Sequence, residues 1–155
     1  MSGIALALLK QGISVSGSDI VKNDRLKEIE KNGGIVLDSQ RPKNIDLIQQ
    51  KFNTKKIIIV ISSAINSENK ELNYCIKKQF SIKHRSEILS LIMKSFKSIG
   101  VAGSHGKTTT STFLTTLLDL CTRDTSSIIG GVIPRYESNA IIKDSQYLIA
   151  EIDES

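Results

Sequence analysis

The chain has 155 residues, a mass of 17.0 kDa and a formal net charge of +5. This length suffices for one ordinary domain or two small ones, and it is far too short for an enzyme with several substrate domains. Apolar residues make up 39% and charged residues 24%, which excludes a disordered chain and predicts a soluble α/β protein with a buried core.

The charges and the apolar runs also argue against nucleic acid and membrane as partners. The 21 Lys and Arg are scattered among 16 Asp and Glu, and the three Tyr and four Phe form no stacking motif. The apolar runs are well below the ~20 residues of a membrane span, and the N-terminus lacks a signal-peptide pattern. Cys75 and Cys121 lie far apart and outside metal or redox spacings, which favours free, buried thiols over a disulfide. We therefore expect a cytoplasmic protein.

Short strands and helices alternate along the whole chain. Helices are predicted at 5–11, 23–32, 44–52, 68–79, 85–96 and 107–121, and strands at 14–17, 35–37, 56–61, 82–84, 98–102 and 147–152. The run at 56–61 is β-branched without alternation, which is typical of a strand buried on both faces of a parallel sheet. The βαβ order throughout predicts an α/β fold with parallel sheets. A domain boundary is expected between about residues 91 and 98, where a new strand begins after the first sheet is complete.

The most informative stretch is IGVAGSHGKTTT at 99–110, where a strand leads through a glycine-containing turn into an amphipathic helix. Such a turn directs backbone N–H groups at a phosphate. The spacing is GxxGKT, a variant of GxxxxGK[ST], which requires glycine where this chain has Val101. The stretch predicts a nucleotide site with Lys107 on the β- and γ-phosphates and Thr108 on Mg²⁺. A plain helix N-terminus with a surface lysine is the alternative.

Glu151 ends the apolar strand at 147–152, where a carboxylate is placed to reach the same metal ion. This role requires that the strand lie beside the one at 98–102, with the carboxylate within one ion's reach of the Thr108 hydroxyl. A solvated strand end is the alternative interpretation of Glu151.

The chain resembles the Mur ligase family in four segments, which are GSHGKTTT at 103–110, YLIAEIDES at 147–155, SGSD at 16–19 and SSAI at 62–65. The resemblance covers essentially the whole chain. It implies a Rossmann-like parallel-sheet domain that binds a UDP-sugar over residues 1–95, followed by the start of a P-loop ATPase domain over residues 96–155.

The resemblance also implies roles for single residues. The ATP-binding loop comprises Gly103, Ser104, His105, Gly106, Lys107, Thr108 and Thr109. Lys107 is its catalytic, phosphate-binding lysine, and the Mg²⁺ ligands are Thr108 and Glu151. The residues implied to bind the UDP-sugar are Asp19, Ser62, Ser63 and His105. Without the resemblance, these four are interpreted as ordinary capping, turn and loop residues.

The reaction implied by the resemblance is ATP-dependent amide formation between UDP-N-acetylmuramate and L-alanine in peptidoglycan synthesis. The family opens with a strand and a GxGGxGMSGIA loop, whereas this chain begins at MSGIA, and the family continues well beyond Ser155. We therefore expect a fragment that is inactive alone. Two alternatives stay open, namely attachment of a recycled tripeptide to the same sugar nucleotide and a non-catalytic nucleotide-binding module.

Overall fold

The computed structural model describes residues 1–21, 23–54, 56–121 and 124–152, and the chain divides into two compact units. The first unit comprises Met1–Ile13 with Ser86–Ser155, and the second comprises Ser14–Arg85. Both units combine helices with parallel strands, so the predicted α/β class is confirmed. The chain passes between the units near residues 13 and 85, and a domain boundary near residue 95 stays a prediction. No helix in the described part of the chain is long and apolar enough to cross a membrane.

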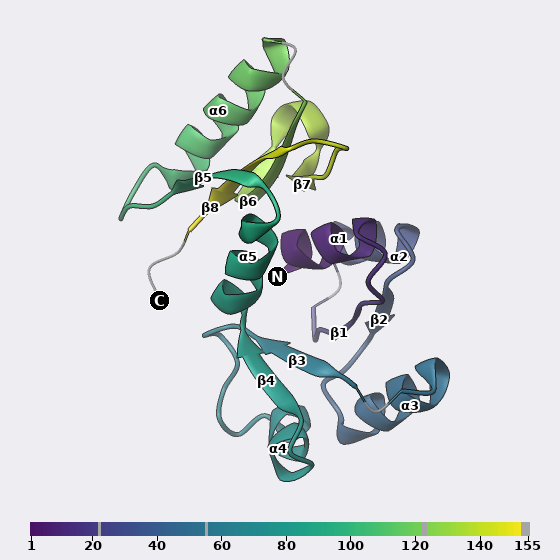
Figure 1. Cartoon of the computed structure of the whole chain (residues 1–155). Helices are drawn as coiled ribbons and strands as arrows, with labels where there is room; N and C mark the ends of the chain where they lie inside the picture. The colour runs from purple at the N-terminus through teal and green to yellow at the C-terminus, as the bar shows by residue number, and fades with distance from the viewer. Residues whose placement is uncertain (22, 55, 122–123, 153–155) are drawn as a thin grey trace. The chain divides into compact units, whose positions relative to one another are not determined.

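The second unit contains two parallel strand pairs, β1 with β2 and β3 with β4 (Figure 1). In chain order its elements are β1 (Ser16–Ser18), α2 (Asp24–Lys31), β2 (Ile35–Leu37), α3 (Pro42–Phe52), β3 (Ile58–Ile61), α4 (Lys70–Lys77) and β4 (Ser81–His84). The side-chain oxygens of Asn23 and Asn69 accept hydrogen bonds from the Leu26 and Leu72 N–H groups. These caps determine where α2 and α4 begin.

β3 is less buried than the sequence predicts. Ile58 is 60% exposed, and the other residues of the strand are half-buried. Within the described ranges β3 pairs with β4 alone, and a sheet of two such short strands offers too little surface to cover both faces of either strand. The prediction that this strand is buried on both faces is therefore wrong.

The first unit contains a four-stranded sheet of order β5-β8-β6-β7 (Figure 1). Its elements are α1 (Ser2–Lys10), α5 (Arg85–Lys94), β5 (Lys97–Val101), α6 (Lys107–Leu120), β6 (Thr125–Ile133), a 3-10 helix (Pro134–Tyr136), β7 (Ser138–Ile141) and β8 (Tyr147–Glu151). β5, β8 and β6 are parallel, but β7 is antiparallel to β6, so the βαβ pattern does not hold throughout. α6 contacts β5, β6 and β8, whereas α1 contacts β6 and β7.

β6 and β7 are missing from the sequence prediction. β6 begins with the polar residues Thr125, Ser126 and Ser127, all of which are buried. The Ser126 hydroxyl donates to the Lys143 carbonyl at 3.3 Å and accepts from the Lys143 N–H at 3.1 Å. Because this partner lies in the loop before β8, the local sequence does not show that a serine is accommodated there.

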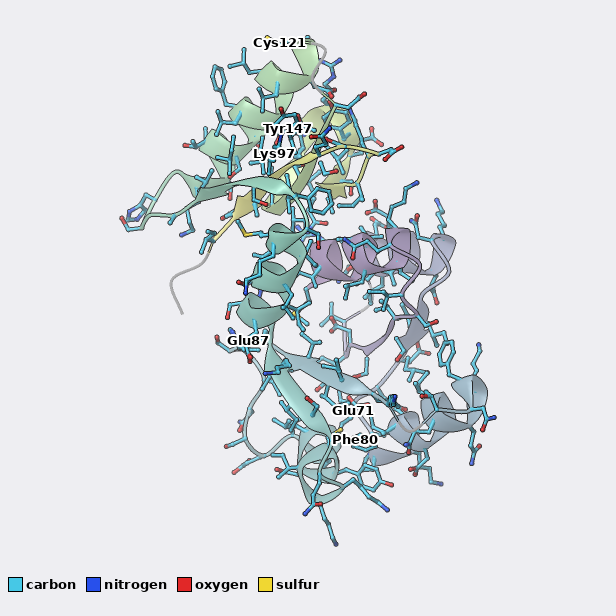
Figure 2. All side chains as sticks on the ribbon, in the orientation of Figure 1. Glu71, Phe80, Glu87, Lys97, Cys121 and Tyr147 are labelled. Atoms are coloured by element: carbon cyan, nitrogen blue, oxygen red, sulfur yellow. The ribbon has the colours of Figure 1, made fainter. Side chains whose placement is uncertain are left out.

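Cys75 and Cys121 form no disulfide with each other. Cys75 in α4 is fully buried, and burial raises the pKa of its thiol to about 11. Cys121 follows the last residue of α6 and is exposed (Figure 2). The prediction of buried thiols therefore holds for Cys75 and is wrong for Cys121, because α6 ends at the surface.

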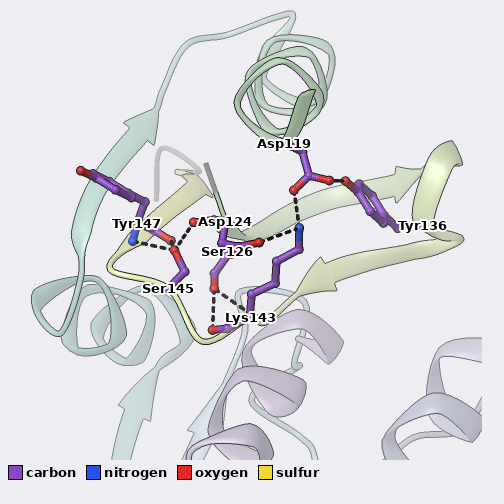
Figure 3. A network of polar contacts seen from close by, with 7 residues as sticks. All are labelled: Asp119, Asp124, Ser126, Tyr136, Lys143, Ser145 and Tyr147. Atoms are coloured by element: carbon purple, nitrogen blue, oxygen red, sulfur yellow. Dashed lines mark hydrogen bonds and ion pairs between the residues drawn. The ribbon is translucent and has the colours of Figure 1, made fainter. Parts of the chain in front are cut away.

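A polar network joins the end of α6 to the loop before β8 (Figure 3). The Asp119 carboxylate accepts hydrogen bonds from Lys143 Nζ and the Tyr136 hydroxyl. The Asp119 side chain is only 14% exposed, so water screens these contacts weakly. The hydrogen bonds from Lys143 and Tyr136 hold the pKa of Asp119 below its ordinary value, and the hydrogen bond to Asp119 raises the pKa of Lys143.

Asp119→Asn is expected to lower the free energy of unfolding by about 1–2 kcal/mol near neutral pH, because it weakens two hydrogen bonds to a charged group. The lowered carboxyl pKa stabilises the fold above pH 3.8, and this contribution is lost as the pH falls through the folded-state pKa. The raised pKa of Lys143 stabilises the fold below pH 10.5 and is lost as the pH rises. Denaturant unfolding should therefore show the largest difference between about pH 4 and pH 10. Asp144→Asn, at an exposed position, is the control. If it lowers the free energy of unfolding as much as Asp119→Asn does, the hydrogen bonds of Asp119 are not the cause.

Candidate functional site

The turn between β5 and α6 depends on two glycines. β5 ends at Val101, and α6 begins at Lys107 with Gly106 as its N-cap, as the sequence predicts. Gly103 has a φ of 142° and Gly106 a φ of 76°, values that other residue types rarely adopt. The first N–H groups of a helix have no acceptor within the helix. The tight turn therefore presents these N–H groups at the end of β5, where an anion can bind them.

Lys107 lies within the same turn. Its Nζ donates a hydrogen bond to the Gly103 carbonyl at 2.6 Å. The Lys107 side chain is half-buried, whereas Ser104 and His105 at the tip of the turn are exposed. The ammonium group and the positive end of the α6 dipole thus act on one small volume, which is a candidate anion site.

Glu151 is next to this turn through the pairing of the strands. β8 pairs in parallel with β5 and places Glu151 opposite Val101, so the predicted strand pairing is confirmed. The Thr108 hydroxyl donates hydrogen bonds to Oε1 of Glu151 at 3.2 Å and to Oε2 at 3.0 Å. The N–H of Gly130 in β6 donates to Oε2 of Glu151 at 2.7 Å. The structure thus brings Thr108 and Glu151 together at the carboxyl ends of β5 and β8, the edge at which α/β sheets bind ligands.

The oxygens of Thr108 and Glu151 suit a hard divalent cation. Two neighbouring ligands of an octahedral Mg²⁺, each about 2.1 Å from the ion, lie about 3 Å apart. Thr108 Oγ1 and Glu151 Oε2 are this far apart while joined by a hydrogen bond, so a cation can replace that bond with little movement of either oxygen. Across the described ranges, no three His, Cys, Asp or Glu side chains form a group that would hold a metal. The arrangement therefore fits an ion that takes its other ligands from phosphate and water. Residues 153–155, which complete the predicted segment YLIAEIDES, lie outside the described residues.

The residues predicted to bind the UDP-sugar in the second unit follow its strands. Asp19 follows β1, and its Oδ1 accepts a hydrogen bond from the Val21 N–H at 3.0 Å, as a turn-capping aspartate does. Ser62 and Ser63 follow β3, and Ser63 Oγ lies 3.2 Å from Nε2 of His84 at the end of β4. All of these residues stand at carboxyl ends of parallel strands, and their binding role stays a prediction.

Sequence reasoning does not single out His84, Gly130 or Gly131. Gly130 donates to Glu151, and Gly131 lies against Thr108. A glycine inside a strand can signal the close approach of another group, but this signal is readable only once 125–133 is known to be a strand. His84 carries no local signal, because its contact with Ser63 depends on the pairing of β3 with β4.

A strand, a glycine turn, a helix that begins with lysine and a carboxylate on the neighbouring strand define an α/β protein with a candidate anion site. Residues 1–97 match the catalytic domain of the Mur ligase family. The chain therefore belongs to the Mur ligase family.

Curated relatives align with the whole chain. The UDP-N-acetylmuramate–L-alanine ligase of Prochlorococcus marinus subsp. pastoris strain MED4 is 58% identical over 155 residues, which are 33% of its own length. The ligase of the same name from Prochlorococcus marinus strain NATL1A is 48% identical over 155 residues, 31% of its length. The chain thus spans about a third of the length of these relatives.

Solved structures share the fold. The UDP-N-acetylmuramate–alanine ligase of Thermotoga maritima has a TM-score of 0.83 at 20% identity, covering 99% of this chain and 34% of that protein. The UDP-N-acetylmuramate:L-alanyl-γ-D-glutamyl-meso-diaminopimelate ligase of Neisseria meningitides has a TM-score of 0.84 at 22% identity, covering 97% of this chain and 48% of that one. These similarities are evidence for the fold alone, and they agree with the predicted fold class.

Proposed function

We propose that this chain carries the nucleotide-binding part of an ATP-dependent ligase that joins L-alanine to UDP-N-acetylmuramate in peptidoglycan synthesis. The observation that carries the proposal is the 3.0 Å separation of Thr108 Oγ1 and Glu151 Oε2 beside the turn that contains Lys107. The names of relatives that align with the whole chain support the two substrates. In this proposal residues 1–95 form the UDP-sugar domain, residues 96–155 begin the ATP domain, and the reaction is cytoplasmic.

The proposed chemistry is phosphoryl transfer followed by amide formation. A carboxylate oxygen of UDP-N-acetylmuramate attacks the γ-phosphorus of ATP and ADP leaves, after which the amine of L-alanine displaces phosphate from the acyl phosphate. Lys107 and the N–H groups of residues 103–109 bind the phosphates and offset the charge on the transferring group. Thr108 and Glu151 hold Mg²⁺, which neutralises phosphate charge when it is bound.

The sugar nucleotide is assigned to Asp19, Ser62, Ser63 and His105. The first three stand at the carboxyl ends of β1 and β3, where hydroxyl and carboxylate oxygens can hydrogen-bond a ribose or an amide. We call the turn between β5 and α6, residues 102–106, the phosphate turn. The exposed His105 near its tip is accessible to a substrate that approaches ATP. In this proposal these four residues recognise the sugar nucleotide, while Lys107, Thr108 and Glu151 offset the charge on the phosphates during phosphoryl transfer.

A chimera tests the proposed function. This chain replaces the aligned third of the Prochlorococcus marinus MED4 relative, and phosphate release is measured with ATP, Mg²⁺ and UDP-N-acetylmuramate. We expect release that requires L-alanine, and we expect none when a tripeptide is supplied instead. Lys107→Ala in the same chimera should lower the rate by about 100-fold or more, the usual effect of removing a group that stabilises the transition state.

Two results would contradict the proposal. Turnover that depends on the tripeptide would assign the chain to the other ligase. Nucleotide binding without any turnover that depends on an amino acid, in a chimera with a native circular dichroism spectrum, would support a non-catalytic module.

A further inference from the structure

Two consecutive glycines in β6, Gly130 and Gly131, contact the groups assigned to Mg²⁺. The Gly130 N–H donates to Oε2 of Glu151 at 2.7 Å. A β-carbon at Gly130 would lie 3.0 Å from Oε2 and 3.2 Å from Oε1 of Glu151, which is tighter than nine in ten real β-carbon contacts. The Glu151 carboxylate is therefore held by the backbone of β6 on a side where a larger residue would push it away.

Gly131 has the corresponding relation to Thr108. A β-carbon at Gly131 would lie 2.7 Å from Cγ2 of Thr108, closer than real β-carbons approach other atoms. Threonine is stiff at χ1, and its Cγ2 and Oγ1 are bonded to the same carbon. Any movement of Cγ2 away from Gly131 therefore also moves Oγ1, the atom that lies 3.0 Å from Glu151.

A positive φ does not account for these glycines. Positive φ values occur at other glycines of the described chain, such as Gly103 and Gly106, but not at Gly130 or Gly131. Glycine in a strand interior is less favourable than alanine, because it loses more entropy and packs no side chain. β6 also shifts its register with β7 between Ile128 and Ile133, an irregularity in which glycine is common. The close approach of Thr108 and Glu151 is a second reason for the pair, and it is specific to this site.

We infer that Gly130 and Gly131 are positioning residues of the Mg²⁺ site, which hold the Glu151 carboxylate and the Thr108 hydroxyl at the separation that one cation requires. The inference rests on the proposed function, because it presumes that these two oxygens bind the metal of Mg·ATP. Gly130 acts on Glu151 by its N–H and by the absence of a side chain, and Gly131 acts on Thr108 by the absence of a side chain. The two positions therefore act on different ligands, and their substitutions can be told apart.

The test compares Gly131→Ala, Thr108→Ser and the double variant in this chain. Calorimetry measures the affinity for ATP with Mg²⁺ and again in EDTA. We expect Gly131→Ala to weaken Mg²⁺-dependent binding about tenfold, as loss of a group that orients a metal ligand does, and to leave binding in EDTA unchanged. Thr108→Ser keeps the hydroxyl but removes Cγ2. The double variant should therefore bind within about twofold of Thr108→Ser alone.

Gly130→Ala provides the contrast. Its added β-carbon meets Glu151, so Thr108→Ser should not restore its Mg²⁺-dependent binding. Val132→Ala is the matched control, because this neighbouring residue of β6 is 47% exposed, and we expect no change in binding. Thermal melting of each variant reports whether the fold is retained.

The outcomes distinguish a failure of the proposed function from a failure of the positioning inference alone. If the unaltered chain shows no Mg²⁺-dependent ATP binding, both are overturned. If it binds Mg·ATP and Gly131→Ala binds equally well, the positioning inference alone is overturned. The same holds if Gly131→Ala weakens binding equally in Mg²⁺ and EDTA without rescue by Thr108→Ser, because that result describes a purely structural role.

Discussion

Lys107→Ala is expected to weaken the binding of Mg·ATP to this chain by about 10- to 100-fold. Lys107 begins α6, and its ammonium group lies within the phosphate turn, 2.6 Å from the Gly103 carbonyl. In the proposed complex with ATP, the ammonium group exchanges that carbonyl for phosphate oxygens. Hydrogen bonds to charged groups contribute about 1.5–3 kcal/mol, which corresponds to this change in affinity. Isothermal titration calorimetry measures it directly.

Lys94→Ala is the control for the lysine. It removes the same charge from the exposed last turn of α5, so it reports any general effect of net charge on a polyanionic ligand. We expect less than a twofold change for this variant, and less still at high salt. Equal losses for Lys94→Ala and Lys107→Ala would show that the binding is unspecific and that the turn is not the phosphate site.

The phosphate turn is predictable from sequence because its requirements are local. Gly103 and Gly106 satisfy backbone angles that few other residues adopt, and Lys107 follows at the first position of a helix. The caps at Asn23 and Asn69 also depend only on neighbouring residues, because each side chain accepts from an N–H group three residues later. The starts of α2 and α4 therefore agree closely with the prediction.

Glu151 is predictable for a different reason. It is 43 residues from Thr108, but parallel strands end at the same edge of a sheet, so topology brings the two residues together. The predicted elements place these two apolar strands next to one another, and the pairing holds although β6 and β7 lie between them in the chain. What the sequence leaves open is the chemistry, because an aspartate or glutamate at a strand end also occurs as a solvated residue.

The glycine pair and β6 are not predictable in this way. β6 begins with buried hydroxyl groups, and Ser126 is accommodated only because the Lys143 backbone lies beside it. A hydropathy pattern cannot reveal a hydrogen-bond partner in a distant loop. The failure at β3 has the same origin, since the exposure of Ile58 depends on which strands pair and not on the β-branched run itself.

Glu151→Gln is expected to raise the Mg²⁺ concentration needed for half-maximal ATP binding at least about tenfold. The amide has the shape of the carboxylate, and its oxygen can still accept the hydrogen bond from Gly130, so the fold and the position of the side chain should persist. What is lost is the negative charge that a hard cation favours. A titration of Mg²⁺ at fixed ATP measures the shift, and binding of ATP in EDTA should be unchanged or slightly tighter, because an anion near the phosphates has been removed.

Glu137→Gln distinguishes an effect at the metal site from an effect of the net charge of the chain. Glu137 is exposed and belongs to the same unit, so its substitution removes one negative charge without touching the turn or β8. If it shifts the Mg²⁺ titration as much as Glu151→Gln does, the effect is general and Glu151 is not a ligand. If neither variant shifts the titration while Lys107→Ala abolishes binding, the turn binds phosphate but the metal is held by phosphate and water alone. Only a shift confined to Glu151→Gln assigns the carboxylate to the cation, because that variant alone changes an oxygen 3.0 Å from the Thr108 hydroxyl.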